Sequence, residues 1–198
     1  MKKIIYIGLL CFLFAAFLIS CSQPEKSSPL TEDEYQIYAV IIDSLYVTSN
    51  RPVVLIGANT ETYPKDPEAL TLDSRFALPS EYNWNELLNS FRQNNGTQFP
   101  VNPTKIETPI TKIPITRQNM FEQLNSQLQE LDRNQTMNYR EKLGIYWFSR
   151  AGFNADNTQA FIFTDFLCGA RCGWPSYYLL TKSHGDWKIV QDFQMGRY

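Results

Sequence analysis

Short apolar runs separated by turn residues fill the last part of the chain, residues 145–198. Four runs rich in aromatic and β-branched residues are broken by Asn/Asp, by Gly/Pro/Cys and by His-Gly-Asp clusters, a pattern typical of an antiparallel meander. The last run alternates with period two, which predicts a strand with one buried and one solvent-exposed face. One face would carry Trp187, Ile189 and Phe193, and the other Lys188, Asp192 and Gln194.

Upstream of the meander, helical periodicity predicts three helices. The first follows a capping box at Thr31-Glu32-Asp33-Glu34 and extends to about Val47, the second runs from Ser80 to Asn94, and the third starts at Thr116. Residues 53–56 read as a strand buried on both sides. Prolines at positions 100, 103, 109 and 114 exclude a helix there and restrict any strand to an edge.

These elements predict an α+β fold. The sheet would be antiparallel, built from the four-strand C-terminal meander plus one upstream strand, with about three helices packed on one face. A chain of 198 residues with 14% aromatic and 19% charged residues suits a single globular domain. We expect that domain to cover residues 31–198.

The first 30 residues indicate export. Lys2 and Lys3 precede an apolar run that ends at Ser20-Cys21, and a polar segment follows. Leu18-Ile19-Ser20-Cys21 looks like a bacterial lipobox, in which cleavage leaves the cysteine as a lipidated N-terminus. Residues 1–20 are therefore predicted as a lipoprotein signal peptide, Cys21 as the lipidation site and residues 21–30 as a tether. The alternatives are a secretory signal with an incidental cysteine and an uncleaved anchor.

The net charge of the mature chain limits the classes of partner that it can bind. Removal of the two signal lysines leaves 16 basic against 20 acidic residues, a net charge of −4, without any basic tract. This balance argues against nucleic acid as a partner. The predicted partner is the lipid bilayer, through the Cys21 anchor, with an envelope protein or a glycan as the candidate ligand. The predicted location is the bacterial cell envelope, on its periplasmic or surface side.

Several segments carry a resemblance. The segment LGIYWFSRAGFNADNTQAFIF from Leu143, the connection ending in YYLL, and TKSHGDW are similar to a group of uncharacterised exported bacterial proteins. That group has an SR-x-GFN segment before a strand, then a Gly-rich loop, a Tyr-rich strand and a Gly turn before Trp. Weaker echoes lie at Glu34-Tyr35 and at residues 53–56, 90–95 and 113–121. The resemblance implies one exported domain and brings no activity, cofactor or catalytic residue.

The same chain departs from that group at Cys168-Gly-Ala-Arg-Cys172, where the group has a Gly/Ala-rich loop. In an oxidising envelope a Cys168–Cys172 disulfide is the predicted outcome. A redox role would need a lowered thiol pKa, and the three-residue spacing after a strand supplies no helix N-terminus to lower it. A zinc site would need two further ligands, whereas Cys11 leaves with the signal and Cys21 carries lipid. No metal site is predicted.

Three other polar groups favour structural roles. His184, the only histidine, lies in a predicted hairpin turn with Gly185, where it is poorly placed to act as a catalytic base. Residues 154–158 space oxygen atoms as a calcium loop could, but an Asx-type turn fits better because the Gly and distal Glu of an EF-hand are missing. Helical spacing makes Glu122, Glu130 and Asp132 a solvated face.

Aromatic residues near the cysteine pair are the candidate ligand contacts. Trp174 and Tyr177 could form a platform of the kind that binds sugars and peptides, although most such residues belong to the core. The predicted function is a non-catalytic envelope lipoprotein that binds or scaffolds through its exposed sheet face or the 168–174 loop. The alternatives are a hydrolase with a carboxylate site and a thiol oxidoreductase that uses Cys168 and Cys172. No catalytic residue and no cofactor is assigned.

Overall fold

The computed structural model has an α+β architecture built around a mixed sheet. It covers residues 29–46, 53–62, 79–120, 122, 126, 144–169 and 172–196. The predicted signal peptide, the Cys21 lipidation site and most of the tether lie outside these residues. So does most of the predicted third helix.

Two α-helices lie within the described part of the chain: α2, Glu32–Tyr46, and α4, Trp84–Asn94. The predicted capping box starts α2, because Thr31 N donates to Glu34 Oε2 at 2.8 Å and Glu34 N donates to Thr31 Oγ1 at 3.2 Å. Asn83 caps α4 by accepting from Glu86 N, so this helix begins four residues later than its pattern predicted. None of the described helices is long and apolar enough to span a membrane.

One mixed sheet forms the centre of the domain. Its strand order is β2-β1-β3-β5-β6-β7, with the short β4 paired to β5 beside this path. β3, β5, β6 and β7 pair antiparallel, which confirms the predicted meander. The strands are β1 Val53–Gly57, β2 Thr111–Ile115, β3 Gly144–Phe148, β4 Gly152–Phe153, β5 Gln159–Gly169, β6 Cys172–Ser183 and β7 Asp186–Gln194.

The upstream strand joins the sheet differently from the prediction. β1 pairs in parallel with both β2 and β3, so the sheet is mixed and not wholly antiparallel. The long stretches of chain between these strands allow the crossovers that parallel pairing requires. All five residues of β1 are buried, as expected for a parallel strand covered on both faces. β2, which contains Pro114, is an edge strand as predicted.

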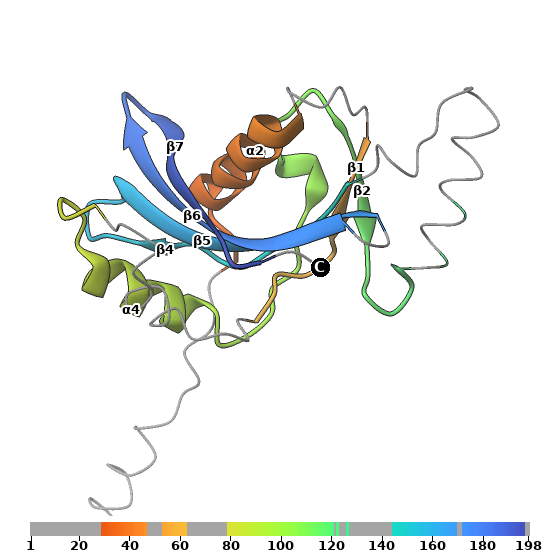
Figure 1. The fold of residues 1–198 in the computed structure, drawn as a ribbon, viewed down its shortest axis with the longest axis horizontal. Helices are drawn as coiled ribbons and strands as arrows, with labels where there is room; N and C mark the ends of the chain where they lie inside the picture. Colours follow the sequence, from red (N-terminus) through yellow and green to blue (C-terminus); the bar gives the residue numbers. More distant parts are fainter. Residues whose placement is uncertain are drawn as a thin grey trace, which may run out of the picture.

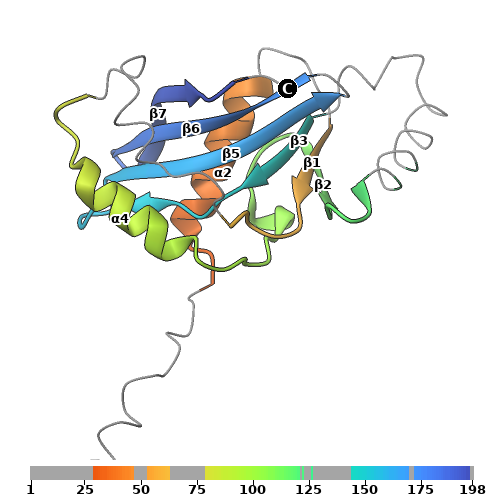
Figure 2. The ribbon, with the colours of Figure 1, turned by 60° about the horizontal axis from the view of Figure 1, so that its bottom comes forward.

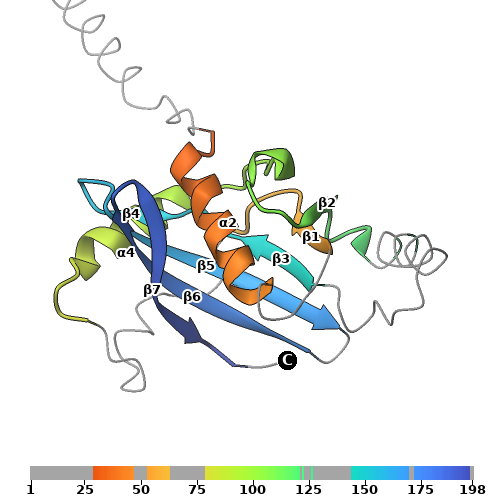
Figure 3. The same ribbon diagram turned by 90° about the horizontal axis from the view of Figure 1, so that it is seen from above.

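The two helices cover opposite faces of the sheet, so the predicted packing of all helices on one face is wrong (Figure 1). Figure 3 shows α2 crossing one face, where Ile162 of β5 belongs to its cluster. Figure 2 shows α4 along the other face, where Phe161 and Phe163 of β5 lie. Because successive strand residues point to opposite faces, β5 supplies both cores. The buried hydrophobic residues that pack with α2 (the α2 cluster) and those that pack with α4 (the α4 cluster) are therefore two separate layers.

A β-bulge divides the last strand. Leu180 pairs with Ile189 but Leu179 pairs with Gln191, which leaves Val190 as the extra residue. Trp187 and Ile189 therefore face the α2 cluster, whereas Phe193 is buried in the α4 cluster. The prediction that all three share one face is wrong for Phe193, because one inserted residue reverses the alternation. The predicted burial of Trp187 is confirmed, with 4% of its surface exposed.

Candidate functional site

The carboxyl ends of three parallel strands meet at one end of the sheet. β1, β2 and β3 run in the same direction, so residues 58–61 after β1 and residues 116–118 after β2 lie beside the end of β3. Such ends are where open sheets with parallel strands commonly bind ligands, since the chain leaves the sheet there and its loops are free to carry polar groups.

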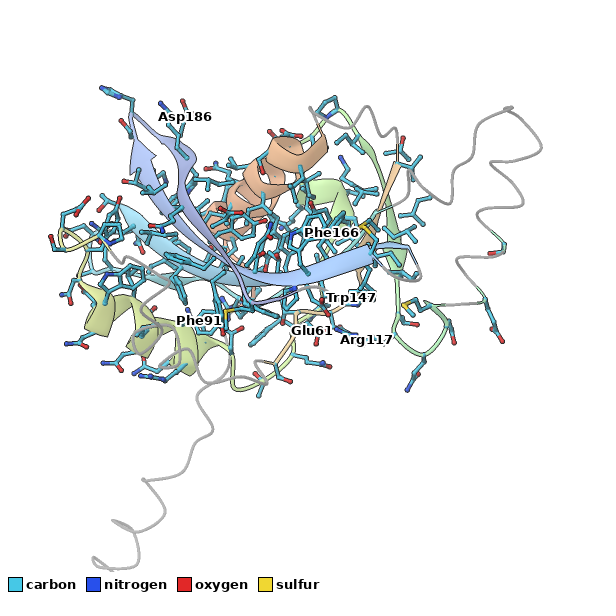
Figure 4. All side chains as sticks on the ribbon, viewed as in Figure 1. Glu61, Phe91, Arg117, Trp147, Phe166 and Asp186 are labelled. Carbon is cyan, nitrogen blue, oxygen red and sulfur yellow. A yellow bond between two sulfur atoms is a disulfide. The ribbon has the colours of Figure 1, made fainter. Side chains whose placement is uncertain are left out.

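Arg117 is the central side chain of this region. Its Nε donates to Glu61 Oε1 at 2.9 Å and its Nη2 donates to Asp165 Oδ2 at 3.2 Å. The guanidinium lies over Trp147, 4.3 Å from the ring centroid, in a cation–π contact. Figure 4 shows Glu61, Arg117 and Trp147 together, on the side of the sheet where Phe91 of α4 lies. We call these three residues and Asp165 the Arg117 cluster.

The backbone fixes the positions of the cluster. Glu61 N donates to the carbonyl of Phe148 at 2.8 Å, and Ala58 N donates to the carbonyl of Ile115 at 2.7 Å. Trp147 and Asp165 are cross-strand partners on β3 and β5, so their side chains lie next to each other on the same face. Arg117 is therefore anchored by groups that the sheet itself positions.

Electrostatics keep Arg117 charged. Burial alone would lower the pKa of its guanidinium, but the hydrogen bond and charge of Glu61, together with those of Asp165, raise the pKa above its ordinary value. The side chain of Arg117 remains 52% exposed, whereas those of Glu61 and Asp165 are 16% and 13% exposed. The Arg117 cluster therefore holds a fixed cation at the surface, and the two carboxylates that support it are largely buried.

A pocket of about 250 Å³ opens beside Arg117. Six of its nine lining residues are polar, so it suits a polar ligand better than an apolar one. The amide side chains of Asn59, Gln98 and Gln118 make no hydrogen bond within the described part of the chain. The lining residues are Ala58, Asn59, Glu61, Gln98, Ile115, Thr116, Arg117, Gln118 and Trp147.

A second, larger hollow of about 420 Å³ lies beside α2 and is lined by both acidic and basic groups, including Asp43, Lys105, Glu107 and Asp186. Burial raises the pKa of the Asp43 carboxyl, an effect that Lys112 partly offsets. Among the described residues no hydrogen bond joins the lining side chains to one another. Nothing therefore fixes their geometry as the sheet fixes the Arg117 cluster.

The segments that carry the family resemblance meet in a buried polar network. Arg150 Nε and Nη2 donate to the two carboxylate oxygens of Glu34 at 2.9 and 3.0 Å, and both side chains are almost fully buried. Asn95 Oδ1 accepts from Arg150 N at 2.7 Å, while Ser149 Oγ accepts from Phe163 N at 2.9 Å. Because every one of these contacts is internal, the SR-x-GFN segment holds elements together and does not form an open site.

The residues predicted to contact a ligand lie elsewhere and belong mainly to the core. Tyr177 is fully buried in the α4 cluster, where it stacks on Phe161 at 5.0 Å, contrary to its expected ligand-facing role. Trp174 is half-buried and packs edge-on against Phe166, with ring centroids 4.9 Å apart. Both faces of the central strands are covered, so the expected exposed sheet face is not available there either.

Cys168 and Cys172 lie at disulfide-bonding distance where β5 turns into β6, with Cα atoms 5.0 Å apart. Cys168 is 5% exposed and Cys172 is exposed. A thiol oxidoreductase would need Cys168 to be accessible, and its burial disfavours that alternative. The oxidised state in the cell stays a prediction.

Both predicted turns are present. His184 and Gly185 have φ angles of 55° and 95°, the left-handed values of a two-residue type I′ hairpin. Asn154 Oδ1 accepts from the amides of Thr158 and Gln159, both at 2.9 Å, so its side chain closes the turn at residues 154–158 over a longer span than the two-residue contact of an Asx turn. Glu122 is helical and exposed, while Glu130 and Asp132 lie outside the described residues.

Sequence reasoning missed the Arg117 cluster. Its members lie at positions 61, 117, 147 and 165, and no local motif links them. The available signal was incomplete, because only Glu61 closely follows a predicted strand, at residues 53–56, whereas Arg117 lies at the predicted start of the third helix. Within the described residues, no group of three or more His, Cys, Asp and Glu side chains could hold a metal ion. No protein-family model, no curated protein and no solved structure significantly matches this chain.

Proposed function

We propose that this protein is an exported, lipid-anchored binding protein of the bacterial envelope that holds a small polar ligand in the pocket beside Arg117. The observation that carries the binding role is the pocket itself, where a fixed guanidinium lies beside three amide side chains that make no hydrogen bond to any described residue. The anchoring and the location rest on the lipobox that ends at Cys21.

A binding role fits the cluster better than a hydrolytic one. General acid–base catalysis needs a proton donor and acceptor that are directed at a substrate. Here Glu61 Oε1 and Asp165 Oδ2 both accept hydrogen bonds from the same guanidinium. The two carboxylates therefore act as a support for Arg117, and Arg117 is the group that faces solvent.

Amide NMR spectra test the binding role. The mature chain, residues 21–198 carrying Cys21→Ser, is titrated with small neutral, anionic, cationic and apolar compounds, because this chain has neither the apolar signal nor the lipid. We expect at least one class to shift the amide signals of residues 58–61 and 116–118. Arg117→Met should weaken this response at least tenfold.

Arg92→Met is the matched control, because Arg92 is an exposed arginine of α4 outside the pocket. It should bind as the parent chain does. The binding role is wrong if no class of compound shifts the pocket amides, or if Arg92→Met weakens the response as much as Arg117→Met.

A further inference from the structure

We infer that the ligand of the pocket is an uncharged, hydroxyl-rich ring, that is, a single sugar residue at the end of a glycan. This inference rests on the binding role proposed above and concerns the chemical class of the ligand. It follows from the charges, the hydrogen-bonding groups and the size of the pocket.

Charge compensation disfavours an ionic ligand. Arg117 already contacts two carboxylates, so the three groups together carry a net charge of −1. An anionic ligand would compete with Glu61 and Asp165 for a cation that they already neutralise. A cationic ligand would meet the exposed guanidinium before the two largely buried carboxylates, and a like charge at that distance is repulsive.

The free hydrogen-bonding groups match hydroxyls. A guanidinium has five N–H donors, and Arg117 uses two of them on Glu61 and Asp165. The remaining three have no acceptor within the described residues. Asn59, Gln98 and Gln118 add amides that each offer both a donor and an acceptor. Neighbouring hydroxyls of a sugar also donate and accept, so they can satisfy these groups without adding charge.

The volume and the lining of the pocket limit the size of the ligand. A volume of about 250 Å³ is below the usual range for drug-sized ligands, roughly 300–1,000 Å³, and fits one ring better than two. Polar and apolar atoms line the pocket in nearly equal measure, although Trp147 itself is covered by Arg117 and is only 2% exposed. A sugar ring, which has polar edges and a limited apolar face, suits such a wall.

The test compares matched sugars by amide NMR on the mature chain, residues 21–198 carrying Cys21→Ser. The neutral probes are methyl glycosides of common hexoses and N-acetylhexosamines. The charged probes are the corresponding hexose phosphates and hexosamines without the acetyl group. We expect at least one neutral glycoside to shift residues 58–61 and 116–118, with its phosphate and amine counterparts at least tenfold weaker.

Glutamine variants locate the contact. Gln98→Leu and Gln118→Leu each remove one free amide from the wall and should weaken the neutral glycoside about tenfold. Gln93→Leu, an exposed position of α4 outside the pocket, should leave the affinity unchanged.

The outcomes separate the two proposals. If charged or apolar probes shift the pocket amides and neutral glycosides do not, the sugar inference is wrong while the binding role stands. If no probe of any class shifts the pocket amides, both proposals are wrong.

Discussion

Trp147 is the residue on which the geometry of the candidate site depends, because its indole lies beneath the Arg117 guanidinium. Its position requires a glycine next to it on β1. A Cβ atom at Gly57 would overlap Cδ1 of Trp147 and lie 3.0 Å from Nε1. No other residue type at position 57 leaves the indole where it is.

Gly57→Ala should therefore push Trp147 away and disturb Arg117. Overpacking of this kind costs about 1–3 kcal/mol of unfolding free energy. Urea unfolding measures that loss, and the shifted amides of residues 116–118 report the disturbed pocket. Gly96→Ala is the matched control, since a Cβ there meets nothing within 4 Å and should change stability by less than about 0.5 kcal/mol. Equal stability of the two variants would show that Trp147 has room to move.

Tyr178 makes stability depend on high pH. Burial raises the pKa of its phenol from 10.0 to about 12, the nearby Asp192 charge adds to this, and the hydroxyls of Ser176 and Thr164 offset part of it. Between these two values the unfolded chain loses the proton first, so folding stability is complete below the unfolded pKa and falls as pH rises toward 12. The loss is on the order of 2–3 kcal/mol.

Urea unfolding from about pH 9 to about pH 11.5 measures this loss. Tyr178→Phe should fall less steeply over that range. Some decline should remain, because burial also raises the pKa of Tyr38. Identical curves for the parent chain and the variant would contradict the role of Tyr178.

At the scale of elements, local pattern predicted most helices and the antiparallel C-terminal meander, but not how the upstream strands pair. The capping box, the buried run at residues 53–56 and the hairpin at His184-Gly185 depend on neighbouring residues, so the sequence contains them. The bulge at Val190 depends on the register of β6 against β7, and parallel pairing of β1 depends on distant strands. Both depend on tertiary contacts. The sequence therefore did not predict which sheet face each helix covers, or that Phe193 lies in the α4 cluster.

Helix α4 packs closely against its sheet face at Gly152 of β4. A Cβ there would overlap Phe91 N and lie 2.5 Å from the carbonyl oxygen of Leu87 and 2.7 Å from Phe91 Cα. These are backbone atoms and cannot rotate away. Gly152→Ala should therefore displace α4 and cost more than Gly57→Ala, where only a side chain must move. Hydrogen exchange should show faster exchange of the α4 amides in Gly152→Ala, and unchanged protection of α4 would contradict close packing.

At the scale of the molecule, Glu34 and Arg150 join α2 to the segment between β3 and β4, 116 residues apart in sequence. The same Glu34 accepts from Thr31 N, and Arg150 lies over Phe99 at 4.5 Å. Pattern alone identified Glu34 as part of a helix cap, whereas its buried partner could be found only from the fold. This ion pair links the α2 layer to the strands that position the candidate site.

Removal of one partner should be costly, because the other is left as a buried, uncompensated charge. Glu34→Gln or Arg150→Met should each lower the unfolding free energy by about 3–5 kcal/mol, and the double variant by clearly less than the sum. Lys182→Met, which breaks the more exposed pair with Asp33, should cost about 1 kcal/mol or less. Additive single and double effects in urea unfolding would show that the two side chains do not depend on each other.

The last prediction concerns how the domain meets the membrane. Leu30 packs into the α2 cluster, so the domain begins there, and only residues 22–29 separate it from Cys21. Even fully extended, eight residues span no more than about 29 Å, which would keep the pocket within a short distance of the bilayer and its glycans. Palmitate should therefore label the parent chain and Cys11→Ser, whose cysteine lies inside the signal, while Cys21→Ser should remain unlabelled. If palmitate still labels Cys21→Ser, then Cys21 is not the lipid anchor, and there is no reason to place this pocket at a membrane surface.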